Sequence, residues 1–253
     1  MKLSIIVPYR NRETHLKLFL NYMNAFLTHH GYDFEFIVVH QQDDLPFNRG
    51  ELLNIGAAYS SGDYFAFHDI DMLPGIDVYQ YPNQPTHAIT RQQRHDFVPY
   101  CDLENQYFNH RYFSGVTLVS RSQYDLAGGY PSGFFGWGME DDEFLRRLIV
   151  NGNFDPQRRS GLFNELPHED RSKGPVRQYL FVEDVSYKLI NSEQTNNITH
   201  IKVELQSALV MKLTALNVKH YVNSIHQTTY DQLCKGKYDR NVDIKTISMD
   251  NKV

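Results

Sequence analysis

The sequence predicts an α/β fold with a mostly parallel central sheet flanked by helices. Two observations support this fold class: short apolar runs with strand character alternate with segments of helical spacing, and glycines or prolines punctuate them. The predicted elements are a strand from Leu3 to Val7, a helix from Glu13 to His30, a strand from Phe34 to His40, a helix from Arg49 to Ser60 and a strand from Tyr64 to His68. Because this β-α-β-α-β order is typical of parallel sheets, right-handed crossovers are expected between the strands.

The first helix is predicted from its apolar face and its end signal. Gly31 is placed to terminate it. Six apolar residues recur at the spacing of one helical face, namely Leu16, Phe19, Leu20, Met23, Phe26 and Leu27.

The later elements are predicted in the same way. A strand covers Val116 to Ser120, and a short helix after it ends at Gly128-Gly129. A helix from Glu140 to Asn151 stops before Gly152 and directs inward Phe144, Leu145, Leu148 and Ile149. Further strand-like runs extend from Val182 to Leu189 and from Ile198 to Leu205.

Two segments do not fit the alternating pattern. Residues 75–112 are polar, irregular and proline-containing, too long for a simple connector, and are expected to form part of the site. Residues 155–178 are basic and glycine-containing, which is typical of a mobile loop. Since no internal repeat or linker is evident, we expect one domain over residues 1–206 and a C-terminal extension, 207–253, packed on it.

Composition limits the class of protein. The chain has 253 residues, of which 41% are hydrophobic and 22% charged, enough for one large domain with a real core. Its net charge of −5 gives no electrostatic footprint for nucleic acid or an anionic membrane. The apolar run from Met1 to Pro8 is too short for a signal peptide or a membrane span. Cys101 and Cys234 lack metal-ligand spacing; a reduced compartment explains them most simply, and a disulfide stays open.

The most informative stretch is Gly133-Phe-Phe-Gly-Trp-Gly-Met-Glu-Asp-Asp-Glu143. Glycines flank the chain's single Trp, Trp137, and four consecutive carboxylates follow it. Like charges repel and a glycine-rich segment loses backbone entropy when it is ordered, so neither feature helps stability. A binding or catalytic use is therefore favoured over the alternative, a solvated acidic start of a helix.

A second acidic element follows the predicted strand from Tyr64 to His68. Asp69 and Asp71 alternate at its carboxyl end, near the crevice where open α/β sheets bind ligands. Hard oxygen ligands of this kind suit Mg²⁺ or Mn²⁺, and a nucleotide diphosphate can complete the coordination shell. The alternative is a loop with two solvated aspartates.

Taken in order, five motifs resemble those of the β-1,4-galactosyltransferases, glycosyltransferase family 7. They are Pro8-Tyr9-Arg10-Asn11-Arg12, Phe47-Asn48-Arg49, Asp69-Ile70-Asp71 with Leu73-Pro74, Tyr112-Phe113-Ser114-Gly115, and Gly136-Trp137-Gly138 leading into Glu140-Asp141-Asp142. The resemblance spans about residues 3–206 and implies a metal-dependent inverting glycosyltransferase with a GT-A type nucleotide-sugar-binding fold. Because the membrane anchor and stem of Golgi members are missing, a bacterial or viral enzyme of the cytoplasm is expected.

The resemblance also implies a donor site. The guanidinium groups of Arg10 and Arg12 suit the nucleotide diphosphate or the uracil, although isolated arginines more often pair with surface acids. Phe47 equally suits a core position at the start of a helix. The residues expected to bind the UDP-sugar or its acceptor are Pro8, Tyr9, Arg10, Arg12, Phe47, Arg49, Asp69, Tyr112, Gly115, Trp137, Glu140 and Asp142.

The family resemblance also implies a metal site and a catalytic base. Asp71 resembles the metal-binding second aspartate of the Asp-x-Asp motif, and His168 is the best further ligand for Mn²⁺ (or Mg²⁺). Glu165 is the alternative that would complete the shell. By motif position, Asp141 is the catalytic base.

The expected reaction is a single displacement that moves a hexose, galactose from UDP-galactose, onto a sugar or glycan acceptor with β linkage. The bulk of Tyr112 would disfavour an N-acetyl group on the donor. Ser114, Phe135, Met139 and Glu51 depart from the family pattern, so the identity of the acceptor is not transferred. The alternatives are another UDP-sugar (UDP-N-acetylgalactosamine or UDP-glucose), a sugar nucleotidyltransferase, which would normally need a glycine-rich phosphate loop, and a noncatalytic carbohydrate-binding module.

Overall fold

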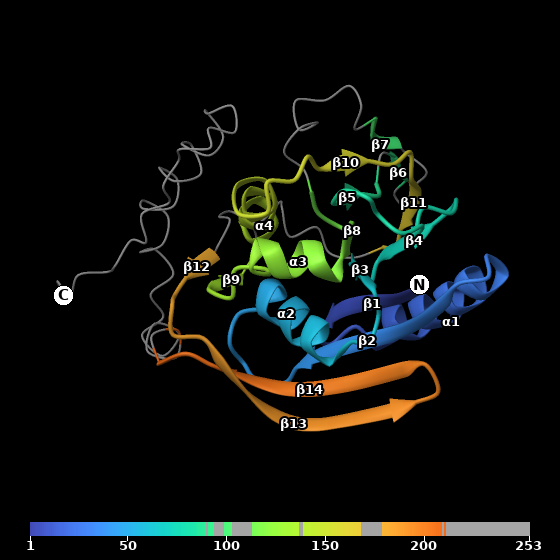
Figure 1. Cartoon of the computed structure of the whole chain (residues 1–253). Coiled ribbons are helices and arrows are strands. Elements are labelled where there is room, and N and C mark those ends of the chain that lie inside the picture. The colour runs from blue at the N-terminus through green and yellow to red at the C-terminus, as the bar shows by residue number, and fades with distance from the viewer. Residues whose placement is uncertain are drawn as a thin grey trace.

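The central sheet has eight strands in the order β10-β5-β8-β3-β1-β2-β14-β13 (Figure 1). The computed structural model describes residues 1–89, 91–93, 99–102, 113–136, 139–167, 179–208 and 210. Four neighbouring strands in the middle of the sheet run parallel, namely β3 (Tyr64–His68), β1 (Lys2–Tyr9), β2 (Asp33–Gln41) and β14 (Ile198–Gln206). The predicted α/β class with a mostly parallel sheet is therefore confirmed.

Antiparallel strands extend this parallel centre on both sides. β8 (Val116–Ser120) runs antiparallel to β3 and to β5 (Thr86–His87), which pairs with β10 (Gln157–Arg158). On the other side, β13 (Ser186–Thr195) forms an antiparallel hairpin with β14. The sheet thus keeps the carboxyl ends of β1, β2 and β3 together along one edge.

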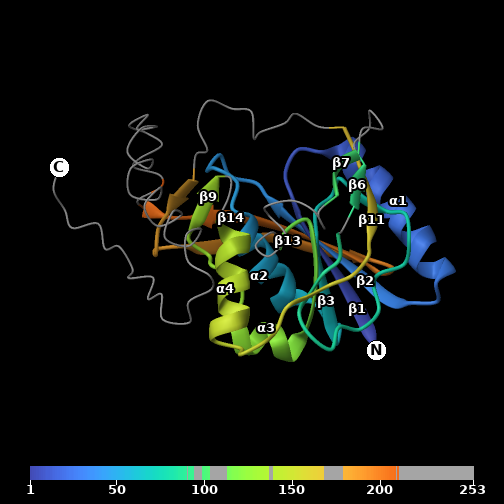
Figure 2. The ribbon, with the colours of Figure 1, turned by 90° about the horizontal axis from the view of Figure 1, so that it is seen from above.

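Helices cover both faces of the sheet (Figure 2). Alternation along β1 sends Ile5 and Val7 to a core with α1 (Glu13–His29), whereas Ile6 joins a second core on the opposite face. That second core includes side chains of α2 (Arg49–Tyr59), α3 (Arg121–Ala127) and α4 (Glu140–Val150). The predicted inward faces of the first and last of these helices are confirmed, because Phe19, Met23, Leu27, Phe144, Leu145 and Leu148 are buried.

Two small sheets accompany the central sheet, and the sequence predicted neither of them. One has the order β4-β11-β6-β7, from β4 (Met72–Pro74), β11 (Leu162–Glu165), β6 (Arg91–Gln93) and β7 (Pro99–Asp102). The other pairs β9 (Phe134–Gly136) with β12 (Tyr179–Phe181). Residues 157–165, expected in a mobile loop, instead carry β10 and β11, while 168–178 lie outside the described residues.

The predicted strand from Val182 to Leu189 has the wrong bounds. β13 begins at Ser186 and continues to Thr195, and its register shifts between Leu189 and Asn191. A β-bulge of this kind interrupts the alternation of side chains that marks a strand in a sequence. The expected extension at 207–253 stays a prediction, because residues 209 and 211–253 are outside the described part of the chain.

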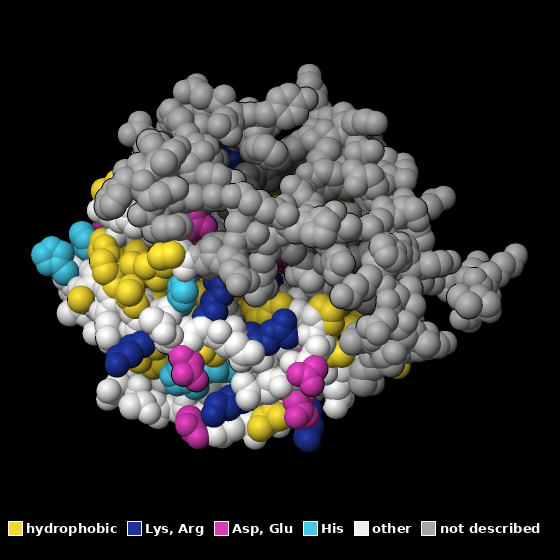
Figure 3. All heavy atoms as spheres, turned by 180° about the vertical axis from the view of Figure 1, so that it is seen from behind, with side chains coloured by type: hydrophobic (Ala, Val, Ile, Leu, Met, Phe, Trp, Pro, Cys, Tyr) yellow, Lys and Arg dark blue, Asp and Glu magenta, His cyan; other side chains and the backbone are white. Residues whose placement is uncertain are grey.

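The described surface carries charges of both signs. On the face in Figure 3, Lys and Arg side chains are interspersed with Asp and Glu, in keeping with the modest net charge of −5. Within the described ranges, no helix is long and apolar enough to cross a membrane.

Candidate active site

Helix α2 follows the carboxyl end of β2, and its cap places Arg49. Asn48 is fully buried, and its Oδ1 accepts a hydrogen bond from the Glu51 backbone N–H at 2.9 Å. The other side of the same amide, Nδ2, donates to the backbone oxygen of Ser132 at 2.6 Å. This cap satisfies a helix end that would otherwise expose unpaired N–H groups, and it fixes the first residue of the helix.

Arg49 joins the two acidic motifs. Its Nε lies 2.9 Å from Asp69 Oδ1, and its Nη1 lies 2.6 Å from Asp141 Oδ1. Glu140 Oε1 is 3.9 Å from the same Nη1. One guanidinium therefore lies among three carboxylates that come from two distant parts of the sequence.

Close packing of α2 against α4 makes this arrangement possible. A Cβ on Gly50 would stand 2.5 Å from the Pro131 oxygen and 3.6 Å from Glu140 Cβ, so only glycine fits there. Met139 precedes α4 with a φ of 77°, in the left-handed region, and supplies no side-chain cap. The N–H groups at this helix start are consequently not capped by the preceding side chain, and they lie beside the carboxylates of Glu140 and Asp141.

The loop before β8 supplies the remaining contact to Asp141. Ser114 Oγ donates to Asp141 Oδ2 at 2.5 Å, and the Gly115 oxygen accepts from the Asp69 backbone N–H at 2.8 Å. Gly115 has a φ of 80°, a conformation that favours glycine. His87 Nε2 lies 2.8 Å from the backbone carbonyl oxygen of Ser114, and this contact also holds the turn.

The electrostatics of the acidic pair differ from those of ordinary carboxylates. Burial, together with the neighbouring Asp141 charge, raises the pKa of Glu140 to about 8. Burial also raises the pKa of Asp141, although Arg49 and the Ser114 hydroxyl oppose the rise. Asp141 and Asp69 more than offset the burial of Arg49 and hold its pKa well above the ordinary value. Perturbed groups that share a partner in this way are typical of functional sites.

A second ion pair lies beside the first. Arg12 Nη1 is 2.8 Å from Asp71 Oδ2, and Asp71 is buried. The Arg12 backbone N–H donates to the Tyr9 hydroxyl at 3.2 Å, which fixes the turn after β1. Thus the arginine and the aspartate from the ends of β1 and β3 contact each other.

Arg10 belongs to a separate group. Its Nη1 donates to the Leu45 oxygen at 2.6 Å, and its guanidinium carbon is 5.3 Å from the centre of the Phe47 ring. Phe47 is partly buried against the core, so the structure gives it both the packing role and a contact with a predicted donor-site arginine. Pro8 lies within β1 and is buried.

The carboxylates at the end of β3 have the donor chemistry that a hard divalent cation requires. Asp71 is followed by β4, which pairs with β11 and brings Glu165 opposite Met72. The Leu166 backbone N–H then donates to the backbone carbonyl oxygen of Asp71 at 2.7 Å. The segment that leads to residue 168 therefore runs beside Asp71. Within the described part of the chain, His, Cys, Asp and Glu side chains form no group of three or more that could hold a metal ion, and His168 is outside it.

Not every predicted residue is placed at this site. Glu143, the last acid of the run, pairs with Arg146 Nε at 2.7 Å and Arg147 Nε at 3.1 Å, so its contacts are structural. Asp142 lies in the first turn of α4. Three predicted site residues lie outside the described part of the chain, namely Tyr112, Trp137 and His168.

Sequence reasoning missed three contributors to this region. Ser114 was noted only as a departure from the family pattern, and His87 and Tyr130 were not singled out. Tyr130 is fully buried, stacks on Phe144 at 3.9 Å between ring centres, and lies 5.9 Å from the Arg49 guanidinium carbon. Its position directly after Gly128-Gly129 was the available signal, since paired glycines mark a tight approach.

The fold and this acidic cluster at the carboxyl ends of parallel strands are those of the nucleotide-sugar-dependent glycosyltransferases with a GT-A fold. Residues 1–84 match the model of the N-terminal region of glycosyl transferase group 7, and residues 94–169 match the model of the N-terminal domain of galactosyltransferase. The chain belongs to glycosyltransferase family 7, the family of the β-1,4-galactosyltransferases.

Similar proteins support the assignment to this family. Beta-1,4-galactosyltransferase 1 of Mus musculus is 36% identical over 158 residues, covering 60% of this chain and 37% of its own length. The Bos taurus protein of the same name is 31% identical over 215 residues, covering 81% of this chain and 51% of its own length. The chain thus spans about half or less of the curated relatives that it matches.

Two solved structures of Drosophila β-1,4-galactosyltransferase 7 have the same fold. The catalytic domain in complex with xylobiose has a TM-score of 0.64 at 26% identity, and the match covers 82% of this chain and 95% of that one. A mutant in complex with manganese, UDP-Gal and xylobiose has a TM-score of 0.66 at 25% identity, with the same coverage. The GT-A architecture predicted from the motifs is confirmed.

Proposed function

We propose that this chain is a metal-dependent inverting galactosyltransferase that moves galactose from UDP-galactose onto a sugar acceptor. The observation that carries the proposal is the Arg49 bridge, which brings Asp69 of the donor motif and Asp141 of the acceptor motif to one guanidinium, at 2.9 and 2.6 Å. A group-transfer enzyme needs its donor and its base within reach of one reacting atom, and the closeness of these two motifs supports the proposal.

The donor site is built from cations and one aspartate. Arg10, Arg12 and Phe47 lie where the nucleotide diphosphate and the uracil are expected, and Asp69 contacts the donor sugar. Arg49 Nη2 is buried and has no hydrogen-bond partner among the described residues. Because buried donors are normally satisfied, an oxygen atom of a bound sugar nucleotide is a suitable acceptor for it.

The metal site uses Asp71, with His168 as the further ligand and Glu165 as the alternative. The divalent cation, Mn²⁺ or Mg²⁺, supplies electrostatic stabilisation of the departing diphosphate when it is bound. The residues of the chain share that task, since Arg10 and Arg12 carry fixed positive charges near the same strand ends.

Asp141 acts as the general base. In its ionised form it takes the proton from the acceptor hydroxyl as that oxygen attacks the anomeric carbon, while the bond to UDP breaks. One displacement inverts the anomeric configuration, and no covalent enzyme intermediate is required. Trp137 is proposed as the platform for the acceptor, whose sugar ring offers an apolar face.

UDP release provides the test. The protein is incubated with Mn²⁺ or with chelator, with UDP-galactose, UDP-glucose and UDP-N-acetylgalactosamine, and with a panel of acceptors that includes galactose-, glucose- and xylose-based disaccharides. We expect release that needs both metal and acceptor and is fastest with UDP-galactose. Binding without release would indicate a carbohydrate-binding module, and pyrophosphate formation from a sugar phosphate and UTP would indicate a nucleotidyltransferase.

The proposal also covers the identity of the donor sugar, the cellular compartment of the protein and the packing of its C-terminal residues. Faster transfer from another UDP-sugar would keep the enzyme class and replace the donor. A cytoplasmic location is proposed from the sequence alone, and fractionation of the native host tests it. Residues 207–253 are proposed to pack on the domain, and limited proteolysis tests this.

A further inference from the structure

Both oxygens of the Asp141 carboxylate are held, and they are held from different elements. Arg49, at the start of α2, contacts Oδ1 at 2.6 Å, and the hydroxyl of Ser114, from the loop before β8, contacts Oδ2 at 2.5 Å. The side chain of Asp141 is 16% exposed, so the neighbouring residues limit access to it but do not close it. A carboxylate has about four lone-pair sites, so these two bonds leave capacity for an incoming hydroxyl.

The backbone of Ser114 is itself held by hydrogen bonds that run through a buried histidine to an exposed arginine. His87 is fully buried. Its Nε2 donates to the backbone carbonyl oxygen of Ser114 at 2.8 Å, because a carbonyl oxygen can only accept. Nδ1 of the same ring is then the acceptor for Arg158 Nη1 at 3.1 Å. Burial and the nearby Arg158 charge lower the pKa of His87 to about 3, so the imidazole stays neutral in this tautomer.

The neighbouring turn adds a second anchor. The Gly115 oxygen accepts from the Asp69 backbone N–H at 2.8 Å, which ties the Ser114 loop to the donor motif. The backbone that carries the hydroxyl is therefore held by the scaffold at Ser114 and at Gly115.

We propose that Ser114 is a positioning residue for Asp141, aiming the carboxylate at the acceptor hydroxyl and favouring its ionised form. This inference rests on the proposed function, in which Asp141 is the base. Arg49 alone holds one oxygen and leaves the carboxylate free to rotate about that contact. The Ser114 bond removes this freedom, and pre-organised groups lose less entropy when the reaction occurs.

The electrostatic consequence has a definite sign. Among the described residues, the charged groups that face Asp141 are Arg49 from α2, Asp69 after β3 and Glu140 beside it on α4. Replacing Ser114 with Ala changes none of these charges and removes one donor to the ionised carboxylate. The pKa of Asp141 then rises, and the acidic limb of the pH–rate profile moves to higher pH.

The test compares Ser114→Ala with Ser114→Thr, which keeps the hydroxyl, and with Ser122→Ala on α3, an exposed serine remote from Asp141. We expect Ser114→Ala to lower kcat by about 10- to 100-fold, as for loss of a hydrogen bond to a charged group. The KM for UDP-galactose should change little, and Thr should restore most of the rate. Ser122→Ala should match the wild type, and thermal unfolding should show that every variant is folded.

A double-mutant cycle separates positioning from structure. Adding Ser114→Ala to Asp141→Asn should cause no further loss of kcat, because the two residues act through one carboxylate. Equal rates and pH profiles for Ser114→Ala and the wild type would overturn the inference. So would a further large loss in the double variant. A wild type that transfers no sugar to any acceptor overturns the proposed function itself, and that outcome is visible before any Ser114 variant is compared.

Discussion

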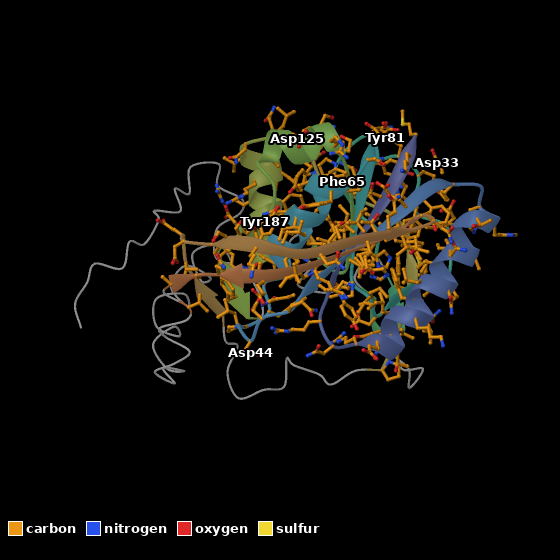
Figure 4. All side chains as sticks on the ribbon, turned by 90° about the horizontal axis from the view of Figure 1, so that it is seen from below. Asp33, Asp44, Phe65, Tyr81, Asp125 and Tyr187 are labelled. Carbon is orange, nitrogen blue, oxygen red and sulfur yellow. The ribbon has the colours of Figure 1, made fainter. Side chains whose placement is uncertain are left out.

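The two ends of the central sheet each bury a carboxylate, and they treat it in opposite ways. At the amino end, Glu35 accepts hydrogen bonds from Lys2 Nζ at 2.7 Å and from Ser4 Oγ at 2.7 Å, and from both the backbone N–H and the hydroxyl of Ser61. At the carboxyl end, Glu140 shares one guanidinium with Asp141 and Asp69. In Figure 4, Asp33 marks the amino end of β2 and Asp44 the loop beyond its carboxyl end.

Burial does not explain the contrast. Glu35 is 7% exposed and Glu140 is 9% exposed, yet the pKa of Glu35 is lowered and that of Glu140 is raised to about 8. Burial acts against the charge of both groups; donors from Lys2, Ser61 and Ser4 outweigh it at Glu35, whereas the Asp141 charge adds to it at Glu140. The number and charge of the partners therefore distinguish the carboxylate whose charge the fold stabilises from the one whose charge it opposes.

The largest expected effect is on turnover at the carboxyl end. Asp141→Asn should keep donor binding but lower kcat by about 10²–10⁴-fold, because an amide cannot accept the acceptor's proton. Steady-state kinetics with UDP-galactose and the best acceptor measures this. Turnover within a few-fold of the wild type would show that Asp141 is not the base, and Glu140 would be the next residue to test.

The second effect is on donor affinity. Asp71→Ala should weaken Mn²⁺-dependent binding of UDP-galactose by at least about 10²-fold, equivalent to about 2.8 kcal/mol. Isothermal titration in Mn²⁺ and in chelator measures it, and Asp71→Asn is the control that keeps the shape of the side chain beside Arg12. Donor affinity that is the same in Asp71→Ala as in the wild type would contradict the metal assignment.

The third effect is on stability, at the amino end. Glu35→Gln should lower the free energy of unfolding by about 2–4 kcal/mol, because it breaks a partly buried ion pair and several hydrogen bonds to a buried carboxylate. Urea unfolding measures this, and kcat per folded molecule should be unchanged. Glu204→Gln is the matched control: its partner Lys188 is exposed and 3.7 Å away, so a change within about 0.5 kcal/mol is expected. A Glu35 variant as stable as this control would remove the contrast.

The smallest effect is a pH dependence of opposite sign at the two ends. The pKa of Glu140 in the folded protein, about 8, lies above the ordinary 4.5. Its ionisation therefore favours the unfolded chain, and stability is lost as pH rises from about 4.5 to about 8. Glu140→Gln escapes this loss, so its stability relative to the wild type should rise steadily between pH 5 and pH 8.

Glu35 gives the reverse trend. Its pKa is lowered in the folded protein, so its contribution is present above about pH 4.5 and is lost as pH falls below that value. Glu35→Gln should therefore be most destabilising at neutral pH and approach the wild type in acid. Parallel pH trends for the two variants, followed by urea unfolding, would contradict the electrostatic difference between the ends.

The sequence predicted the elements whose signals are local. The strand from Tyr64 to His68 and the strand from Val116 to Ser120 match β3 and β8, because apolar runs between turn residues mark buried strands. The second sheet was missed, since strands of three or four residues such as β4 and β11 show no periodicity. Their pairing also joins segments far apart in the chain, Leu73 with Asn164 for example.

The site residues also divide into those that a local motif marks and those that only the folded chain brings together. Asp69, Asp71 and Asp141 were singled out from short motifs; the structure brings Asp69 and Asp141 to the Arg49 guanidinium and pairs Asp71 with Arg12. Their partners were not predictable, because the Arg49–Asp141 contact spans 92 positions and spacing along a chain carries no information at that range. Ser114 was noticed as unusual, but its bond to Asp141 depends on a turn that His87 holds from another strand.

The most direct test of the account is the structure of the product. The wild type and Asp141→Asn are incubated at equal concentration with UDP-galactose, Mn²⁺ and the best acceptor, and the product is analysed by proton NMR. We predict a β-linked galactoside and an equal amount of UDP from the wild type, and almost no product from the variant in the same time. An α-linked product, or UDP release without a new glycosidic bond, would contradict the proposed displacement. Equal product from the variant would contradict the role of Asp141.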